Sequence, residues 1–121
     1  QFLFLVVGGD TLSQSEILDP GKKKISMNGK YEVFMREDGN LQILGPNGDA
    51  LWETLTSCDP DQLKGAVLDG NGRMLVIDFG GHTLWSSSDD QRDAVFIVIE
   101  YDGYWRGYNK NGEVLYQFPE N

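Results

Sequence analysis

The chain repeats one short pattern three times, and this repetition limits the folds that it can adopt. Three segments align, each with a glycine near its centre: FMREDGNLQIL from Phe34, VLDGNGRMLVI from Val67 and VIEYDGYWRGY from Val98. The central glycines lie 33 and 31 residues apart, at Gly39, Gly72 and Gly103. A second marker keeps the same spacing, since NGDALW ends at Trp52, GGHTLW at Trp85 and NGEVLY at Tyr116. Two landmarks with one spacing indicate a fold of three equivalent units.

Apolar and polar residues alternate within each unit, which is the pattern of strands that bury one face. The apolar positions are Tyr31, Val33, Met35, Leu41, Ile43, Met74, Val76, Val95, Ile97 and Ile99. Each unit therefore predicts a small antiparallel sheet with tight glycine turns. One such sheet cannot cover its own apolar face, but three sheets packed around an axis would cover one another. We expect an all-β prism of three antiparallel sheets with internal pseudo-threefold symmetry, and with Trp52, Trp85 and Tyr116 in its core.

The length of the chain fits one domain, since 121 residues can bury one core but not two. We expect a single domain over residues 1–121, with repeat units at about 29–56, 64–88 and 94–118, and with residues 1–28 completing the prism. The linkers TSCDPDQ and SSSDDQRD predict polar corners between the units. The apolar segment FLFLVV at residues 2–7 is either a first strand or the end of a signal sequence, and it is too short to cross a membrane.

The net charge of the chain limits the classes of partner that it can bind. Nineteen acidic residues against ten basic ones give a net charge of −9, which repels nucleic-acid phosphates and anionic lipid. We therefore expect no nucleic acid and no membrane insertion, whereas a neutral or cationic partner fits. The basic run KKK at residues 22–24 predicts a solvated hairpin tip. Cys58 is the only cysteine, so no disulfide can form within the chain.

From about Gly9 onward the chain resembles the bulb-type mannose-binding lectins, which have the β-prism II fold. The resemblance rests on the opening GGDTLSQSEILDPG, on DGNL at residues 38–41, and on LWETLTS and LWSSS at the ends of two units. It implies a carbohydrate-binding module without enzymatic activity or a cofactor. It also implies secretion, although the single cysteine leaves a cytoplasmic location open. Homodimers through exchange of the terminal strand, here VLYQFPEN, are implied as well. The disulfide usual in the family is missing, because Gly39 stands where a cysteine often occurs.

Sugar sites in that family carry the pattern Q-x-D-x-N-x-V-x-Y once per unit. The resemblance implies that Gln, Asp, Asn and Tyr hydrogen-bond mannose hydroxyls while Val contacts the ring carbons. Alternate residues of a strand share one face, so the five positions would form a shallow polar row. In unit one the positions hold Arg36, Asp38, Asn40, Gln42 and Leu44, of which Asp38 and Asn40 match. In unit two, without a match, they hold Asp69, Asn71, Arg73, Leu75 and Ile77. In unit three, with matches at the second and fifth positions, they hold Glu100, Asp102, Tyr104, Arg106 and Tyr108.

The mannose sites are thus largely eroded, and we expect weak or altered glycan recognition. A millimolar Kd corresponds to only about −4 kcal/mol, and losing the Tyr hydroxyl and the Gln amide at about 1 kcal/mol each removes roughly half of it. The first candidate site comprises Arg36, Asp38, Asn40 and Gln42, although Asp38 and Asn40 could equally serve only the turn. Arg36 and Arg106 present donor forks that suit a carboxylate, so the glycan partner is mannose-type or acidic.

The alternative function is a protein-interaction or structural module on the same fold. Alternation predicts that Tyr104 and Tyr108 are exposed on the outer face beside Arg106, with Trp105 inside. Tyrosine and arginine are enriched at protein interfaces, so this face is the second candidate surface.

Catalytic and metal chemistry find little support in the sequence. His82 is the only histidine and lacks a nucleophile pattern, so we expect a solvated turn residue. Glu100 and Asp102 share a strand face, but an open prism face lacks the cleft that a glycosidase needs. The segment LDGNGR at residues 68–73 begins like a calcium loop without the required glutamate, and Cys58 with His82 cannot form a zinc site. We therefore expect no enzyme and no metal.

Overall fold

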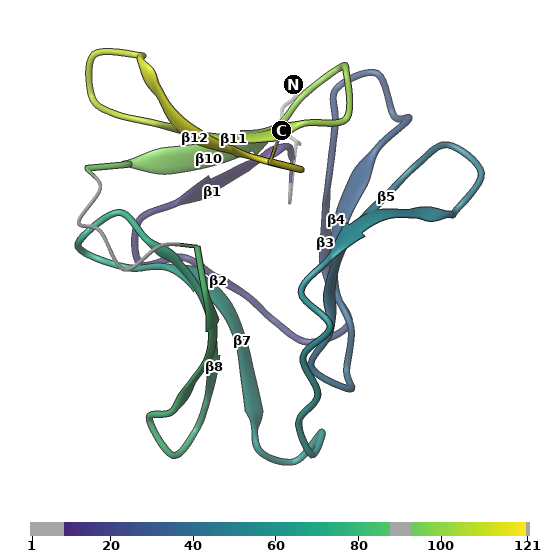
Figure 1. Ribbon diagram of the computed structural model, residues 1–121, viewed down its shortest axis with the longest axis vertical. Helices are drawn as coiled ribbons and strands as arrows, with labels where there is room; N and C mark the ends of the chain where they lie inside the picture. Colours follow the sequence, from purple (N-terminus) through teal and green to yellow (C-terminus); the bar gives the residue numbers. More distant parts are fainter. Residues whose placement is uncertain (1–8, 88–92, 121) are drawn as a thin grey trace, which may run out of the picture.

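The computed structural model describes residues 9–87 and 93–120. The expected first strand at residues 2–7 and part of the SSSDDQRD corner lie outside this part of the chain. Within it, twelve strands form three antiparallel four-stranded sheets and there is no helix. Accordingly, nothing in these two ranges is a helix with the length and hydropathy that a bilayer crossing requires. Figure 1 shows the sheets as the three sides of a triangle, which confirms the predicted all-β prism.

Each side of the prism is a four-stranded sheet that we name after its repeat unit. The first sheet has the order β3 (Lys23–Ile25), β4 (Glu32–Met35), β5 (Leu41–Leu44), β6 (Ala50–Glu53). The second sheet has the order β2 (Ile17–Leu18), β7 (Leu63–Leu68), β8 (Met74–Asp78), β9 (Thr83–Ser86). The third sheet has the order β1 (Thr11–Ser13), β10 (Phe96–Ile99), β11 (Trp105–Tyr108), β12 (Val114–Phe118).

The three repeats are equivalent at the level of the backbone. In each unit the central glycine donates its N–H to the carbonyl three residues earlier, at 3.1, 3.0 and 3.0 Å for Gly39, Gly72 and Gly103. Their φ angles of 98°, 85° and 86° lie in the left-handed region, where a side chain would be strained. Each unit also has a β-bulge, after Ile43, Val76 and Gly107, again 33 and 31 residues apart. The constant spacing in the sequence therefore reflects one hairpin geometry used three times.

The N-terminal stretch supplies one outer strand to every sheet. β1 pairs with β10, β2 with β7 and β3 with β4, so residues 11–25 run along all three sides of the prism. The carbonyl of Gly9 accepts the N–H of Ile25 at 2.9 Å, and that of Asp10 accepts the N–H of Ile99 at 3.0 Å. These two bonds join the first and third sheets, so each repeat unit depends on the N-terminal stretch to complete its sheet.

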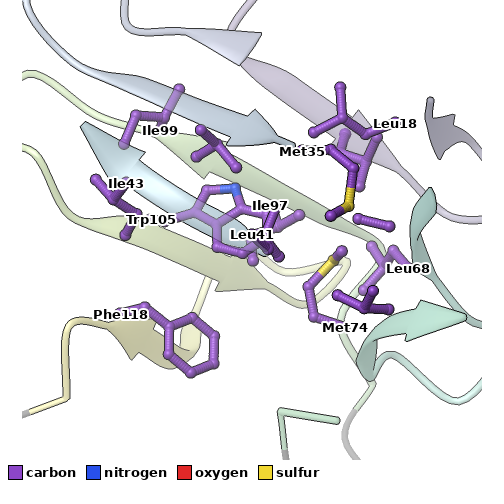
Figure 2. Close-up of a cluster of buried hydrophobic side chains, with 14 of the residues drawn as sticks. Leu18, Met35, Leu41, Ile43, Leu68, Met74, Ile97, Ile99, Trp105 and Phe118 are labelled. Carbon is purple, nitrogen blue, oxygen red and sulfur yellow. The ribbon is translucent and has the colours of Figure 1, made fainter. Parts of the chain in front are cut away.

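The inward-facing side chains of the three sheets form one core. Eight of the alternating apolar residues are 0% exposed, namely Val33, Met35, Leu41, Ile43, Met74, Val76, Ile97 and Ile99. Figure 2 shows this cluster, with Met35 from the first sheet, Met74 from the second and Trp105 from the third. Burial of each large apolar side chain contributes about 1.5–3 kcal/mol. Apolar packing among the three sheets therefore stabilises the fold.

Phe118 is the centre of an aromatic cluster inside the prism. The ring centroids of Trp52, Trp85 and Tyr116 lie 4.9, 5.5 and 5.7 Å from that of Phe118. The three repeat aromatics are partly buried against the core, whereas Phe118 is 2% exposed. Because β12 pairs with β11 of the same chain, the strand considered for exchange carries a core residue of its own domain.

The prediction of a hairpin tip at residues 22–24 is wrong. Lys23 and Lys24 belong to β3, and Lys24 lies opposite the core residue Val33, so its side chain is only 7% exposed. Its Nζ pairs with Glu16 Oε2 at 2.7 Å. Although partial burial opposes the shift, the hydrogen bond from Lys24 lowers the pKa of Glu16. A lysine can occupy an inward position because its aliphatic stem packs while its charged end reaches a partner.

Candidate functional site

The outer faces of the three sheets carry the residues that the repeat pattern marks as sugar-binding. The ladder registers place one row of four outward residues across each sheet. In the first sheet the row is Lys23, Phe34, Gln42 and Glu53. In the second sheet it is Ile17, Val67, Leu75 and Ser86. In the third sheet it is Thr11, Val98, Arg106 and Gln117. The three faces therefore differ in chemistry although their backbones are equivalent.

In unit one the amide side chains bond within the protein. Asn40 and Gln42 are only 8% and 9% exposed. Asn40 Nδ2 and Gln42 Nε2 donate to the same oxygen, Glu53 Oε1, at 2.9 and 2.7 Å. These bonds, led by the one from Gln42, lower the pKa of Glu53. Asn40 Oδ1 also accepts the N–H of Leu55 at 2.9 Å and the hydroxyl of Thr54 at 3.3 Å. Asn40 thus fixes the segment after β6, where Leu55 has a φ of 57°.

The other members of unit one serve the turn. Arg36 Nη2 forms an ion pair with Asp38 Oδ2 at 2.5 Å, and the backbone N–H of Asn40 donates to Asp38 Oδ1 at 3.2 Å. The second bond is an Asx turn, which stabilises the loop between β4 and β5. Leu44 offers only apolar surface. The turn function that the sequence allowed is therefore seen for Asp38, whereas the Asn40 side chain bonds to the distant residues 53–55.

In unit two the marked polar residues also form hydrogen bonds with one another. Asp69 accepts the backbone N–H groups of Asn71 and Arg73 at 2.9 Å each, and it pairs with the Arg73 guanidinium at 3.2 Å. Leu75 and Ile77 follow on the outer face. Together with Ile17 and Val67 they make the second sheet's outer face apolar.

Unit three builds a charged network around Arg106. The Arg106 guanidinium donates to Glu100 Oε1 at 2.6 Å, to Asp102 Oδ2 at 2.9 Å and to Gln117 Oε1 at 2.9 Å. Its Cζ lies 4.9 Å from the centre of the Tyr104 ring, a cation–π distance. The hydrogen bond from Arg106 lowers the pKa of Asp102, and the same bond raises the pKa of Arg106. The network therefore favours the ionised form of Asp102.

Tyr104 and Tyr108 lie on the outer side, as predicted, but they are half-buried rather than exposed. Tyr108 donates its hydroxyl to Glu100 Oε2 at 2.6 Å, and its ring stacks on Phe96 with centroids 5.4 Å apart. Burial and then the bond to Glu100 raise the pKa of Tyr108 to about 12. Trp105 points inward and is 1% exposed, as the alternation predicts.

A cavity of about 410 Å³ opens over the third sheet beside this network. Its lining includes Asp10, Val98, Glu100, Tyr101, Asp102 and Arg106. Its volume falls in the range of small-molecule sites, about 300–1,000 Å³. The sequence marked Glu100, Asp102 and Arg106 but missed Asp10, Val98 and Tyr101. Val98 lies next to Arg106 through the register of β10 with β11, and Asp10 reaches the cavity from the N-terminal stretch, so local spacing reveals neither.

Two further cavities of similar size lie away from the marked rows. One of about 430 Å³ is lined by residues between 16 and 24, and one of about 400 Å³ by Gln14, Gly70, Asp93 and Asn109 among others. Of the five-residue rows marked by the repeat pattern, only that of unit three contributes to any of these three cavities. Unit three is therefore the best candidate site.

Cys58 lies opposite Gly39, a contact that sequence reasoning missed. A Cβ built on Gly39 would stand 3.0 Å from Cys58 Cβ and 2.7 Å from Cys58 N. A side chain at Gly39 would therefore collide with Cys58, so this close approach of two backbone segments requires glycine. Burial raises the pKa of the Cys58 thiol.

The remaining polar candidates stand outside this site. His82 is 76% exposed at its side chain and pairs with Asp78 across 3.0 Å in its turn. Across residues 9–87 and 93–120 no group of three or more His, Cys, Asp or Glu side chains is arranged to hold a metal ion.

Comparison with solved structures identifies the fold. No protein-family model and no curated protein matches the sequence. A Marasmius oreades lectin matches with a TM-score of 0.76 at 22% identity, over 92% of this chain and 91% of the other. Monomeric monocot mannose-binding lectins from Gastrodia elata match with 0.76 at 19% identity, over 93% and 98%. A domain-swapped lectin dimer from Mycobacterium smegmatis matches with 0.52 at 24% identity, over 91% and 99%. These likenesses show that the chain has the β-prism II fold.

Proposed function

We propose that the chain is a non-enzymatic, lectin-like carbohydrate-binding module whose site is the cavity over the third sheet. The observation that carries the proposal is that this cavity coincides with a repeat position marked as sugar-binding. Its carboxylates accept hydrogen bonds from hydroxyl groups, Val98 offers an apolar contact for ring carbons, and Tyr101 stands 65% exposed at its rim. The fold is shared with lectins that bind mannose, as in Gastrodia elata.

The proposal gives one site per chain rather than three. The amides of unit one are bonded to Glu53, and the second sheet has an apolar outer face. A single open site on a sheet face binds a monosaccharide weakly, with a Kd of about 1 mM or more. Useful strength then requires several copies of the module on one assembly.

A titration of the chain with monosaccharides, followed by NMR chemical shifts, tests the proposal. We expect saturable shifts in residues 98–106 that Tyr101→Ala weakens severalfold. Phe79→Ala is the matched control, because Phe79 is an aromatic residue with 68% exposure in the second unit. Absence of any saturable shift for neutral, amino and acidic sugars at about 10 mM would contradict the proposed function.

The chain itself is proposed to be a single domain over residues 1–121, with a homodimer that exchanges the terminal strand as the alternative to a monomer. The pairing of β12 with β11 and the burial of Phe118 support a strand that stays in its own sheet. Light scattering coupled to size-exclusion chromatography should give the mass of one chain. A mass of two chains would favour strand exchange instead.

A protein-interaction module remains the alternative function, and one observation favours it. The second sheet presents Ile17, Val67, Leu75 and Ile77 outward, none of them packed against the core. If this face mediates self-association, the mass by light scattering should rise with concentration and Leu75→Asp should abolish the rise. A concentration-independent mass together with sugar binding excludes this alternative.

A further inference from the structure

Hydrogen-bond donors and acceptors are unequally available in the cavity over the third sheet. All three nitrogens of the Arg106 guanidinium already donate, to Glu100, Asp102 and Gln117. The Tyr108 hydroxyl donates to Glu100, and the backbone N–H of Tyr104 donates to Asp102 at 3.1 Å. Most donors of the network are thus directed to carboxylate and amide oxygens of the protein itself.

The carboxylates retain capacity to accept. Each carboxylate oxygen has about two lone-pair positions. Glu100 Oε2 accepts one bond from Tyr108, Asp102 Oδ2 accepts one from Arg106, and Asp10 Oδ1 accepts one from the Thr11 hydroxyl at 2.8 Å. A ligand therefore meets mainly acceptors, and its own donors decide how well it binds.

The net charge of the cavity lining also favours a ligand with positively charged donors. Asp10, Glu100 and Asp102 carry three negative charges, against one positive charge on Arg106. The carboxylates flank Arg106, so its positive charge is compensated before a ligand arrives. A ligand carboxylate would face the two remaining negative charges, whereas an ammonium group would be attracted by them.

From the cavity, its donor inventory and its charge, we propose that the site prefers sugars that carry a protonated amine, such as hexosamines, over neutral hexoses. It disfavours acidic sugars, contrary to what Arg36 and Arg106 suggest when they are read from the sequence. This preference rests on the proposed carbohydrate-binding function. Hydrogen bonds from charged donors to carboxylates are roughly twice as strong as neutral ones, and solvent exposure reduces the difference. The expected preference is therefore modest, about threefold to tenfold in Kd.

A matched set of sugars tests this preference by NMR titration at fixed salt. Glucosamine should bind about threefold to tenfold more tightly than glucose. N-acetylglucosamine, which keeps the nitrogen but loses the charge, should bind no better than glucose. Glucuronic acid should bind more weakly than glucose because its carboxylate is repelled.

Asp10→Asn is the decisive variant, because it removes one negative charge from the cavity and leaves the bonds of Arg106 intact. It should reduce the preference for glucosamine to less than about twofold, measured as the ratio of the Kd for glucose to the Kd for glucosamine in the same variant. Asp61→Asn, at an exposed corner, removes the same charge elsewhere and should leave the preference unchanged.

The outcomes separate this inference from the proposed function. Equal binding of glucose and glucosamine, or tightest binding of glucuronic acid, overturns the amine preference while the carbohydrate site stands. Binding of no sugar overturns the proposed function and the preference together. A preference that survives in Asp10→Asn overturns the assignment of this cavity as its origin.

Discussion

Substitution of Asn40 by alanine should destabilise the protein, because its side chain is a structural part of unit one. The variant removes the acceptor of the Leu55 N–H, a hydrogen bond that contributes about 0.5–1.5 kcal/mol at a residue that is 78% exposed. It also removes one of the two amide donors of Glu53, whereas the bond from Gln42 remains. The bond from the Thr54 hydroxyl to Asn40 Oδ1 is lost as well, while water can replace part of the lost bonds, so we expect a loss of about 1–2 kcal/mol in unfolding free energy.

Urea unfolding followed by tryptophan fluorescence measures this loss, because three tryptophans lie in or against the core. The midpoint should fall while the m-value stays unchanged. Asn111→Ala, at an exposed turn position, is the control and should change the free energy by less than about 0.5 kcal/mol. A loss below about 0.5 kcal/mol for Asn40→Ala would refute the argument, and it would make Asn40 available again as a sugar-binding residue.

Three further perturbations test other parts of the fold. Gly39→Ala should lower the unfolding free energy in urea by more than Gly48→Ala does, because both glycines have a left-handed φ but only at Gly39 would the added Cβ meet the backbone N of Cys58, at 2.7 Å. Equal losses for the two variants would contradict the contact. Glu16→Gln should destabilise the protein by about 2 kcal/mol in urea unfolding, because it leaves Lys24 buried without its counter-charge. Lys24→Met should be nearly neutral, and a larger loss for Lys24→Met than for Glu16→Gln would contradict the role given to this ion pair. The phenolate absorbance of Tyr108, taken as the difference from Tyr108→Phe, should appear near pH 12, and titration at pH 10 would contradict its bond to Glu100. The stability that the raised pKa contributes is complete below about pH 10 and is lost between pH 10 and 12.

The sequence predicts the prism because the repeat and the alternation are local signals that the three-sheet core reinforces. Gly39, Gly72 and Gly103 are required by the left-handed turn, so their spacing maps directly onto the hairpins. The inward alternation of Met35 and Met74 likewise maps directly onto the core. Local and tertiary requirements agree at these positions, and such agreement makes a fold predictable.

The candidate site was less predictable because its properties depend on neighbouring strands. The row on β11 names Arg106, but only the register with β10 and β12 brings Val98 and Gln117 to its sides. In unit one, the side-chain amides of Asn40 and Gln42 donate hydrogen bonds to Glu53, which lies on β6 outside the motif. Contacts with residues outside the motif thus decide which motif groups stay available to a ligand, and the spacing of residues in the sequence does not show these contacts.

Separation of core and outer face explains how one fold carries three different surfaces. On each strand the inward residues pack against the other two sheets, so a change there is felt throughout the core. The outward residues alternate with them and contact mainly their own sheet. Glu53, Leu75 and Arg106 could therefore arise at outward positions without disturbing Phe118 and its aromatic partners. A threefold prism can in this way use one face for internal bonds and another for apolar surface, while a third keeps an open cavity. The binding capacity of such a chain follows from its outer rows and not from the number of its repeats.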